Sequence, residues 1–166
     1  MWEPSMPKCV LDTSICVDLW NAGILELTLR LPFEFYLPDV IAEECQEPAG
    51  AELIALGVTR VTLEGEHIEF IITLRNNYPK CSVGDLFALT YARVHTQILL
   101  TGDGKLRTAA LAEGVEVHGI IWLLEALIAG KILSPIDAAD SLEKMRAKGS
   151  WLPKKECDEF IRRCRE

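Results

Sequence analysis

The sequence lacks the features that mark a secreted, membrane-spanning or disordered protein. Its first residues, MWEPSMPK, contain no apolar run of the kind found in signal peptides. The longest apolar stretch, Gly119 to Gly130, is interrupted by Glu125 and is too short to span a bilayer. No low-complexity tract and no internal repeat is evident. We therefore expect a cytoplasmic protein, and a length of 166 residues suggests one domain with a short helical appendage.

The cysteines and histidines lack the spacing of a zinc site. The chain has six cysteines but no CxxC pair, and their spacings match no zinc pattern. All except Cys81 lie in segments with an apolar periodicity, where a free cysteine packs as a small hydrophobic residue. His67, His95 and His118 share no ligand spacing either, so the sequence disfavours zinc.

An excess of basic residues is also absent, since the formal net charge is −8. Proteins that coat DNA non-specifically present a basic face to the phosphates, and this charge argues against that function. A cluster of carboxylates that binds Mg²⁺ or Mn²⁺ reverses the sign of the charge locally. The composition is therefore compatible with a metal-dependent nuclease.

Short apolar segments alternate with helical patterns along the chain. Strands are predicted at residues 8–12, 33–37, 58–63, 97–101 and 115–117. Helices are predicted at residues 13–22, 38–46, 51–56, 66–76, 82–95, 103–113, 120–129, 135–148 and 154–165. This alternation predicts an α/β fold with a mostly parallel central sheet and helices on both faces. Functional groups of such a sheet lie at the carboxyl ends of its strands, near the switch in strand order.

The last two predicted helices lie beyond the α/β pattern. We assign residues 1–133 to the α/β domain and residues 134–166 to a C-terminal helical extension that packs on the core or on a partner. The extension holds much of the basic charge, but acidic residues are interleaved with it, as on a solvated helical face. Its apolar residues are available for docking: Leu142, Met145, Trp151, Leu152 and Phe160.

Two acidic residues follow predicted strands. Asp12 is the last residue of the first strand, and Asp103 lies two residues beyond the strand QILLT. A carboxylate at the end of a buried strand is costly unless a cation or hydrogen-bond donors bind it. Capping of the following helix is the alternative role for either residue, because Asp is a good N-cap.

Asp85 stands in front of an apolar helix and has two candidate roles. Ser82 and Asp85 fit a capping box, and taken alone this role is favoured. Ala88, Leu89 and Ala92 follow Asp85 by three, four and seven residues, which places it on the packed face of the helix. A functional carboxylate is therefore the second candidate.

Glu43 and Glu44 compete for a place on the helix predicted at residues 38–46. The apolar side of this helix is defined by Leu37, Val40 and Ile41. Glu44 follows Val40 by four residues and Ile41 by three, so it falls in the middle of that side. Glu43 falls on its edge. We choose Glu44 as the candidate and keep Glu43 in reserve.

Together these acids on four separate elements predict a site for a hard divalent cation. Mg²⁺ and Mn²⁺ prefer carboxylate oxygens and keep several water molecules. Such a site can activate water and hold a phosphodiester for in-line attack. The candidate metal-binding and catalytic residues are Asp12, Glu44, Asp85 and Asp103.

The order and local sequence of the acids resemble the PIN-domain family. The family's opening strand is similar to KCVLDTSICVDLW, and its proline-initiated helix is similar to LPDVIAEEC. Its acid before an Ala-rich helix matches SVGDLFALTYAR, and its closing block matches ILLTGDGKLRTAALAEGVEVHGIIWLLEALIAGKI. The resemblance covers about residues 8 to 133 and places the four candidate acids at the family's acidic positions. Some members carry an additional acid near the fourth, where this chain has Gly102 and Gly104, which leaves open whether one metal or two bind.

The resemblance implies a PIN-like nuclease domain at residues 1–133, acting as a Mg²⁺- or Mn²⁺-dependent ribonuclease on single-stranded or structured RNA, often as a homodimer. Many small bacterial and archaeal members are VapC-like toxins held by an antitoxin protein. Ser14 and Thr101 would orient the carboxylates, with ordinary turn and cap chemistry as the alternative. Lys105 and Arg107 would contact RNA phosphate, with solvated helix charges as the alternative.

Two other functions stay open at this point. A phosphatase of the haloacid-dehalogenase type uses a strand-end Asp as its nucleophile and needs a second Asp two residues later. This chain has Ser14 at that position, and Asp18 comes a full helical turn too late. A non-catalytic PIN-like module that binds protein or RNA would need no metal.

Overall fold

The computed structural model describes residues 6–166 and contains a parallel sheet of five strands. The strands are β1 (Lys8–Leu11), β2 (Glu34–Pro38), β3 (Thr59–Val61), β4 (Ile98–Leu100) and β5 (Val117–His118). Their order across the sheet is β3-β2-β1-β4-β5, and neighbouring strands pair in parallel. β1 is therefore central, and the strand order switches between β1 and β4. The segment MWEPSMPK, which we expect not to be a signal peptide, begins with residues 1–5, and these lie outside the described residues.

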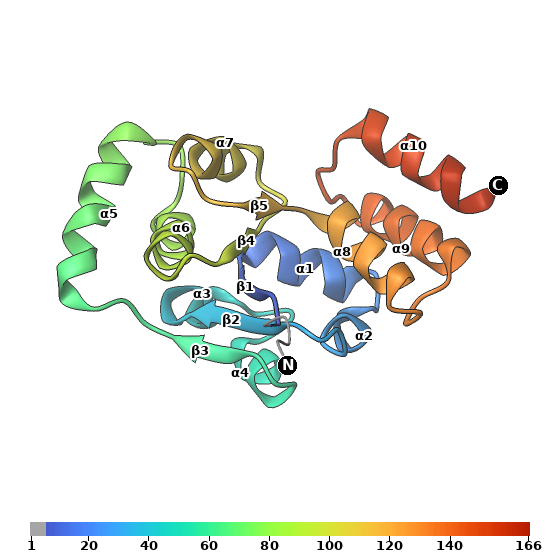
Figure 1. The fold of residues 1–166 in the computed structure, drawn as a ribbon, viewed down its shortest axis with the longest axis horizontal. Coiled ribbons are helices and arrows are strands. Elements are labelled where there is room, and N and C mark those ends of the chain that lie inside the picture. The colour runs from blue at the N-terminus through green and yellow to red at the C-terminus, as the bar shows by residue number, and fades with distance from the viewer. Residues whose placement is uncertain (1–5) are drawn as a thin grey trace, which may run out of the picture.

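Helices lie on both sides of the sheet (Figure 1). They are α1 (Thr13–Asn21), α2 (Leu25–Thr28), α3 (Asp39–Glu44), α4 (Gly50–Ala55), α5 (Gly65–Asn77), α6 (Val83–His95), α7 (Gly104–Ala112), α8 (Ile120–Ala129), α9 (Pro135–Ala147) and α10 (Lys154–Arg165). Helix α6 packs against β1, β2 and β4 with α5 outside it, while α1 contacts α2 and α9 at the other side. The predicted three-layer α/β/α fold with a parallel sheet is confirmed. None of the helices within residues 6–166 has the length and apolar character needed to cross a membrane.

The two strands beside the switch point are buried on both faces. Val10 of β1 and Leu99 and Leu100 of β4 have no exposed surface. This burial explains why both strands are continuous apolar runs rather than alternating patterns. All six cysteines are free, and Cys9 and Cys16 are fully buried in this core.

Some boundaries differ from the sequence-based predictions. The short helix α2 was not predicted, because four residues are too few to show a helical periodicity. Helix α3 ends at Glu44 instead of residue 46, since Cys45 takes an extended backbone conformation. The last strand is Val117–His118 instead of residues 115–117.

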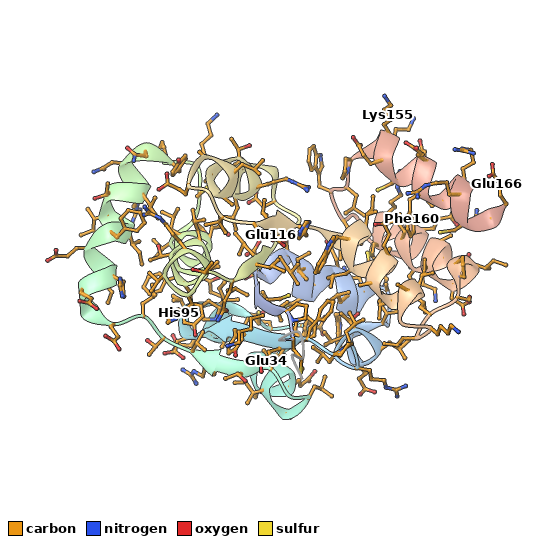
Figure 2. The ribbon with its side chains drawn as sticks, in the orientation of Figure 1. Glu34, His95, Glu116, Lys155, Phe160 and Glu166 are labelled. Atoms are coloured by element: carbon orange, nitrogen blue, oxygen red, sulfur yellow. The ribbon has the colours of Figure 1, made fainter. Side chains whose placement is uncertain are left out.

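The C-terminal helices pack onto the α/β core. Helix α9 contacts α1 and α8, and α10 lies along α9. Leu142 and Met145 of α9 are fully buried, and Phe160 lies on the side of α10 that faces α9 (Figure 2). Trp151 behaves differently from the other apolar residues of this region, because 80% of its surface is exposed. Trp151 is thus not buried in the core of this chain, and its docking on a dimer mate or a partner stays a prediction.

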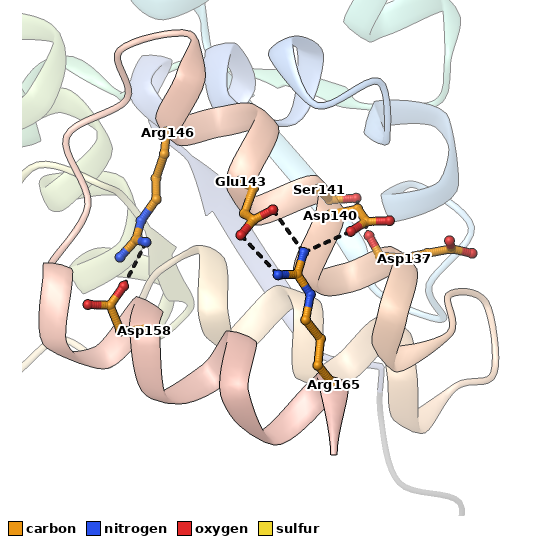
Figure 3. A network of polar contacts seen from close by, with 7 residues as sticks. All are labelled: Asp137, Asp140, Ser141, Glu143, Arg146, Asp158 and Arg165. Atoms are coloured by element: carbon orange, nitrogen blue, oxygen red, sulfur yellow. Dashed lines mark hydrogen bonds and ion pairs between the residues drawn. The ribbon is translucent and has the colours of Figure 1, made fainter.

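Two arginines fasten α10 to α9 at separate points (Figure 3). Arg146 pairs with Asp158 at 2.8 Å and also donates to the carbonyl oxygen of Lys154 at 3.0 Å. Arg165 pairs with Asp140 at 3.1 Å and with Glu143 at 2.8 Å. Exposed ion pairs add little stability, so their main effect is to fix the register of the two helices.

The division of the chain at residue 133 into an α/β domain and a C-terminal helical extension stays a prediction.

Removal of the Phe160 side chain tests how firmly α10 is docked. Phe160→Ala should lower the free energy of unfolding by about 3–5 kcal/mol, because it leaves a cavity between buried side chains. Ile136→Ala on exposed α9 surface is the matched control and should cost less than about 0.5 kcal/mol. Urea unfolding of the full chain measures both values. Equal costs for the two variants would contradict the packing described.

Candidate active site

The carboxylate of Asp12 lies at the carboxyl end of β1, where the strand order switches. Only 2% of the residue is exposed, and its backbone N–H donates to the carbonyl oxygen of Leu100 on β4 at 3.1 Å. Its Oδ1 accepts from the backbone N–H of Thr13 at 2.7 Å, so Asp12 is also the N-cap of α1. The strand-end position and the capping role left open by the sequence are both present.

Two hydroxyl groups connect Asp12 to the loop that follows β4. Thr101 Oγ1 donates to Asp12 Oδ2 at 2.6 Å and accepts from the Asp103 N–H at 3.0 Å. Ser14 Oγ donates to the same oxygen at 2.9 Å and accepts from the Gly102 N–H at 2.9 Å. Each hydroxyl group has one proton, which it donates to Asp12. The lone pairs of its oxygen then accept hydrogen bonds from the backbone N–H groups of the loop. The two bridges hold the β4–α7 loop against the end of β1.

Burial changes the acidity of this carboxylate. Loss of solvation, together with the smaller effect of the nearby charge of Asp85, raises the pKa of Asp12 to a net value of about 6. The hydrogen bonds from Thr101, Ser14 and Thr13 act in the opposite direction because they stabilise the anion. Asp12 is thus a carboxylate that gains from a neighbouring positive charge.

Asp85 and Asp103 both lie at helix N-termini near Asp12. Asp85 accepts from the Ser82 N–H at 2.9 Å in the predicted capping box of α6. Asp103 caps α7 by accepting from the Lys105 N–H at 2.8 Å. Burial and the charges of Asp85, Asp103 and Asp12 raise the pKa of Cys81 to about 11, so all three acids lie in the neighbourhood of this thiol.

Glu44 faces the start of α6, although it is exposed. Both of its carboxylate oxygens lie 3.1 Å from the position that a Cβ would take on Gly84. The expectation that Glu44 lies in the middle of a buried helix side is wrong, because α3 ends at this residue. Glu43 points elsewhere and pairs with Arg60 at 3.5 Å.

The donor atoms suit a hard cation, but the acids are not drawn together around one. Within residues 6–166, no group of three or more His, Cys, Asp or Glu is close enough to hold a metal ion as the side chains stand. Asp12 accepts three hydrogen bonds where a carboxylate has about four lone-pair sites, so Oδ1 keeps capacity for a ligand bond. Asp85 and Asp103 each use one oxygen for capping. Oxygen ligands of this kind are those that Mg²⁺ and Mn²⁺ prefer.

Lys105 and Arg107 lie on the exposed first turn of α7. Neither forms an ion pair within the described part of the chain. The guanidinium of Arg107 lies beside Gly119, 3.9 Å from the position of a Cβ on that residue. A helix N-terminus favours anions, and contact of Lys105 and Arg107 with RNA phosphate stays a prediction.

Asp18 is a neighbour of the site that we considered in the sequence only as the second acid of a phosphatase, where it comes a full helical turn too late. It is 7% exposed, its Oδ1 accepts from Ser150 Oγ, and its Oδ2 lies 3.3 Å from the position of a Cβ on Gly102. Burial raises its pKa, and the hydrogen bond from Ser150 lowers it. Asp18 lines a cavity of about 630 Å³ together with Ser14 and Asp103. The sequence signal that indicates this position is its spacing, because Asp18 follows Ser14 by four residues and so lies on the same face of the helix.

The described structure is a parallel α/β domain with Asp12 buried at the switch point of its sheet. The family model described as the PIN domain matches residues 8–166, and the chain belongs to the PIN-domain family. PIN domains are generally nucleases, usually use divalent metal ions, and have a fold compatible with RNA binding. The match includes α9 and α10, beyond the residues that carried the resemblance in sequence. No curated protein matches the sequence significantly.

The raised pKa of Asp12 predicts a specific pH dependence of stability. Because the folded pKa of about 6 exceeds the unfolded value, the folded chain binds more protons between about pH 4 and 6. The free energy of unfolding of metal-free protein should therefore fall as pH rises through this range. Asp12→Asn has no such titration. The free energy of unfolding of Asp12→Asn minus that of wild type should therefore rise by about 2–3 kcal/mol from pH 4 to pH 8. Urea unfolding in EDTA measures the difference, and a difference independent of pH would contradict the assignment.

Proposed function

We propose that the chain is a divalent-metal-dependent endoribonuclease that hydrolyses RNA phosphodiester bonds. The observation that carries this proposal is the carboxylate of Asp12, buried at the switch point of a PIN-domain sheet and surrounded by further acids. Burial of an anion without a nearby positive charge is costly. A divalent cation would remove that cost.

The carboxylates would hold the ion and would not attack the substrate themselves. Asp12 has a remaining ligand position on Oδ1, and Asp85 and Asp103 each have an oxygen that is not used in capping. Glu44 is the fourth candidate, since its carboxylate lies over Gly84 at the start of α6. When bound, Mg²⁺ or Mn²⁺ would offset the charge of the phosphate and make a water molecule acidic enough to attack it.

The remaining residues would position these groups and the substrate. Ser14 and Thr101 would fix the orientation of Asp12 through hydrogen bonds to Oδ2, which leave Oδ1 with the Thr13 N–H as its donor. Lys105 and Arg107 would bind RNA phosphates beside Asp103. A cation and these two side chains provide local positive charge on a chain whose net charge is −8.

More specific expectations accompany this proposal. A homodimer, a VapC-like toxin role with an antitoxin partner, and a cytoplasmic location stay predictions. The alternative function is a PIN-like module that binds RNA or protein without cleavage, and the experiments below distinguish it.

Loss of Asp12 or Asp103 should abolish cleavage while the fold survives. Asp12→Asn and Asp103→Asn should each lower the cleavage rate by more than about 100-fold, since even residues that only support metal ligands contribute about 10–100-fold. Asp137→Asn on exposed α9 surface is the control and should keep wild-type activity. The assay follows a labelled single-stranded RNA with Mn²⁺ or with EDTA. Activity retained in either site variant, or in EDTA, would reject the mechanism.

Adjacent glutamates offer a matched pair for the fourth acid. Glu44→Gln should reduce the cleavage rate by about 10–100-fold, because its carboxylate faces the site. Glu43→Gln should leave the rate near wild type, since Glu43 forms only an exposed ion pair with Arg60. The comparison uses the same RNA at several Mn²⁺ concentrations. A larger loss of cleavage rate for Glu43→Gln than for Glu44→Gln would make Glu43 the fourth acid instead of Glu44.

A further inference from the structure

Trp151 is a large aromatic side chain left in solvent beside the candidate site. It follows Ser150 in the linker between α9 and α10 and is 80% exposed. Its Cζ3 lies 4.0 Å from the position of a Cβ on Gly104, so the ring stands over the N-terminus of α7. An exposed tryptophan carries a large apolar surface that is normally buried, which points to a bound partner.

The linker that carries Trp151 is held from both sides. Ser150 Oγ donates to the buried Asp18 of α1, which fixes the residue before the tryptophan. After it, Arg146 binds both Asp158 and the carbonyl oxygen of Lys154 at the start of α10 (Figure 3). A φ of +90° at Gly149, favourable only for glycine, turns the chain out of α9. The ring is therefore presented by a fixed backbone, which lowers the entropy lost on binding.

Trp151 lies between two cavities that share Asp103. The first, of about 510 Å³, is lined by Trp151, His118, Trp122, Asp103 and Arg107 among others. The second, of about 630 Å³, contains Ser14, Asp18 and Lys105. The rings of His118 and Trp122 are stacked with their centroids 4.5 Å apart and an interplanar angle of 4°, so stacked aromatic rings and charged residues both line the first cavity. A ligand that passes Asp103 therefore meets aromatic and cationic side chains together.

The charges around the first cavity indicate how a ligand would lie. Glu125, Glu156 and Glu159 line this cavity together with Arg163, which is paired with Glu125 at 3.4 Å. The glutamates repel phosphates, whereas Lys105 and Arg107 on α7 attract them. A polynucleotide would thus place its backbone along α7 and direct a base toward the aromatic side chains.

We propose that Trp151 is a stacking platform for an unpaired base of single-stranded RNA next to the phosphate held at the carboxylates. The inference rests on the proposed function for the identity of the ligand. A base in a duplex has both faces covered by its neighbours, so only an unpaired base can stack on this ring. Apolar residues such as Ile121 and Leu152 also line the first cavity, but Lys105 and Arg107 beside the ring favour an anionic ligand over an apolar protein surface.

Binding measured without cleavage tests this inference separately from the nuclease activity. The full chain carrying Asp12→Asn is titrated in Mg²⁺ against a short fluorescein-labelled single-stranded RNA, and anisotropy gives Kd. Adding Trp151→Ala should raise Kd about tenfold, the effect expected for loss of one stacked base. Trp151→Phe should restore most of the affinity. Trp20→Ala is the matched control, since Trp20 is 41% exposed on α1 and should leave Kd unchanged.

Two further measurements fix the chemistry of the contact. An abasic ribose-phosphate oligomer should bind the Asp12→Asn chain with the same affinity whether or not Trp151→Ala is present, because it has no base to stack. Equal RNA affinities with and without Trp151→Ala, or no RNA binding by either chain, would overturn the proposal. So would a dimer by light scattering that Trp151→Ala dissociates while RNA affinity is unchanged, since Trp151 would then join two chains. Loss of the cleavage reaction alone would reject the nuclease and leave the base contact standing.

Discussion

The buried carboxylate of Asp12 is the constraint on which the rest of the site depends. The central strand β1 ends in an acid that is 2% exposed, and burial works against its charge. The protein meets this cost in part with donors from Thr13, Ser14 and Thr101. Those donors do not restore ordinary acidity, since the pKa still lies at about 6. The residual cost is what a divalent cation would relieve.

The same hydrogen bonds also shape the loop where Asp103 lies. Because Ser14 and Thr101 each donate to Asp12, they accept from the backbone N–H groups of Gly102 and Asp103. The β4–α7 loop is thereby closed onto β1, and α7 begins beside the carboxylates. The charge state of one residue, the position of a loop and the direction of a helix N-terminus are linked. Any change that releases Thr101 or Ser14 would disturb all three.

The C-terminal helices pack on the α/β core beside this arrangement. Ser150 donates to Asp18 on α1, and α9 packs on α1 and α8, so the linker with Trp151 lies beside the site. The family match continues through residue 166 and includes these helices. An acidic chain can bind an anionic ligand in this way because the attraction is local, from a cation and α7, while aromatic stacking needs no net charge.

Much of the fold could be predicted because the two strands beside the switch point are largely buried. Continuous apolar runs such as QILLT show buried strands, and the acids that follow them had to lie at the carboxyl edge. The bond between Thr101 and Asp12 joins residues 89 apart, and it depends on β1 and β4 being neighbours, which no local pattern reveals. Glu44 was placed on a buried side because periodicity assumes that a helix continues, whereas α3 ends there. The exposure of Trp151 was also beyond local patterns, because an apolar residue in a linker docks or stays free according to tertiary contacts alone.

The location of a bound Mn²⁺ ion tests the central claim most directly. Crystals of the full chain grown with Mn²⁺ and measured at the manganese absorption edge would show the ion in an anomalous difference map. We predict a peak about 2.1 Å from a carboxylate oxygen of Asp12, with Asp103 turned toward the same ion. Peaks confined to surface carboxylates, with none at Asp12, would contradict the account and favour a PIN-domain module that binds without metal.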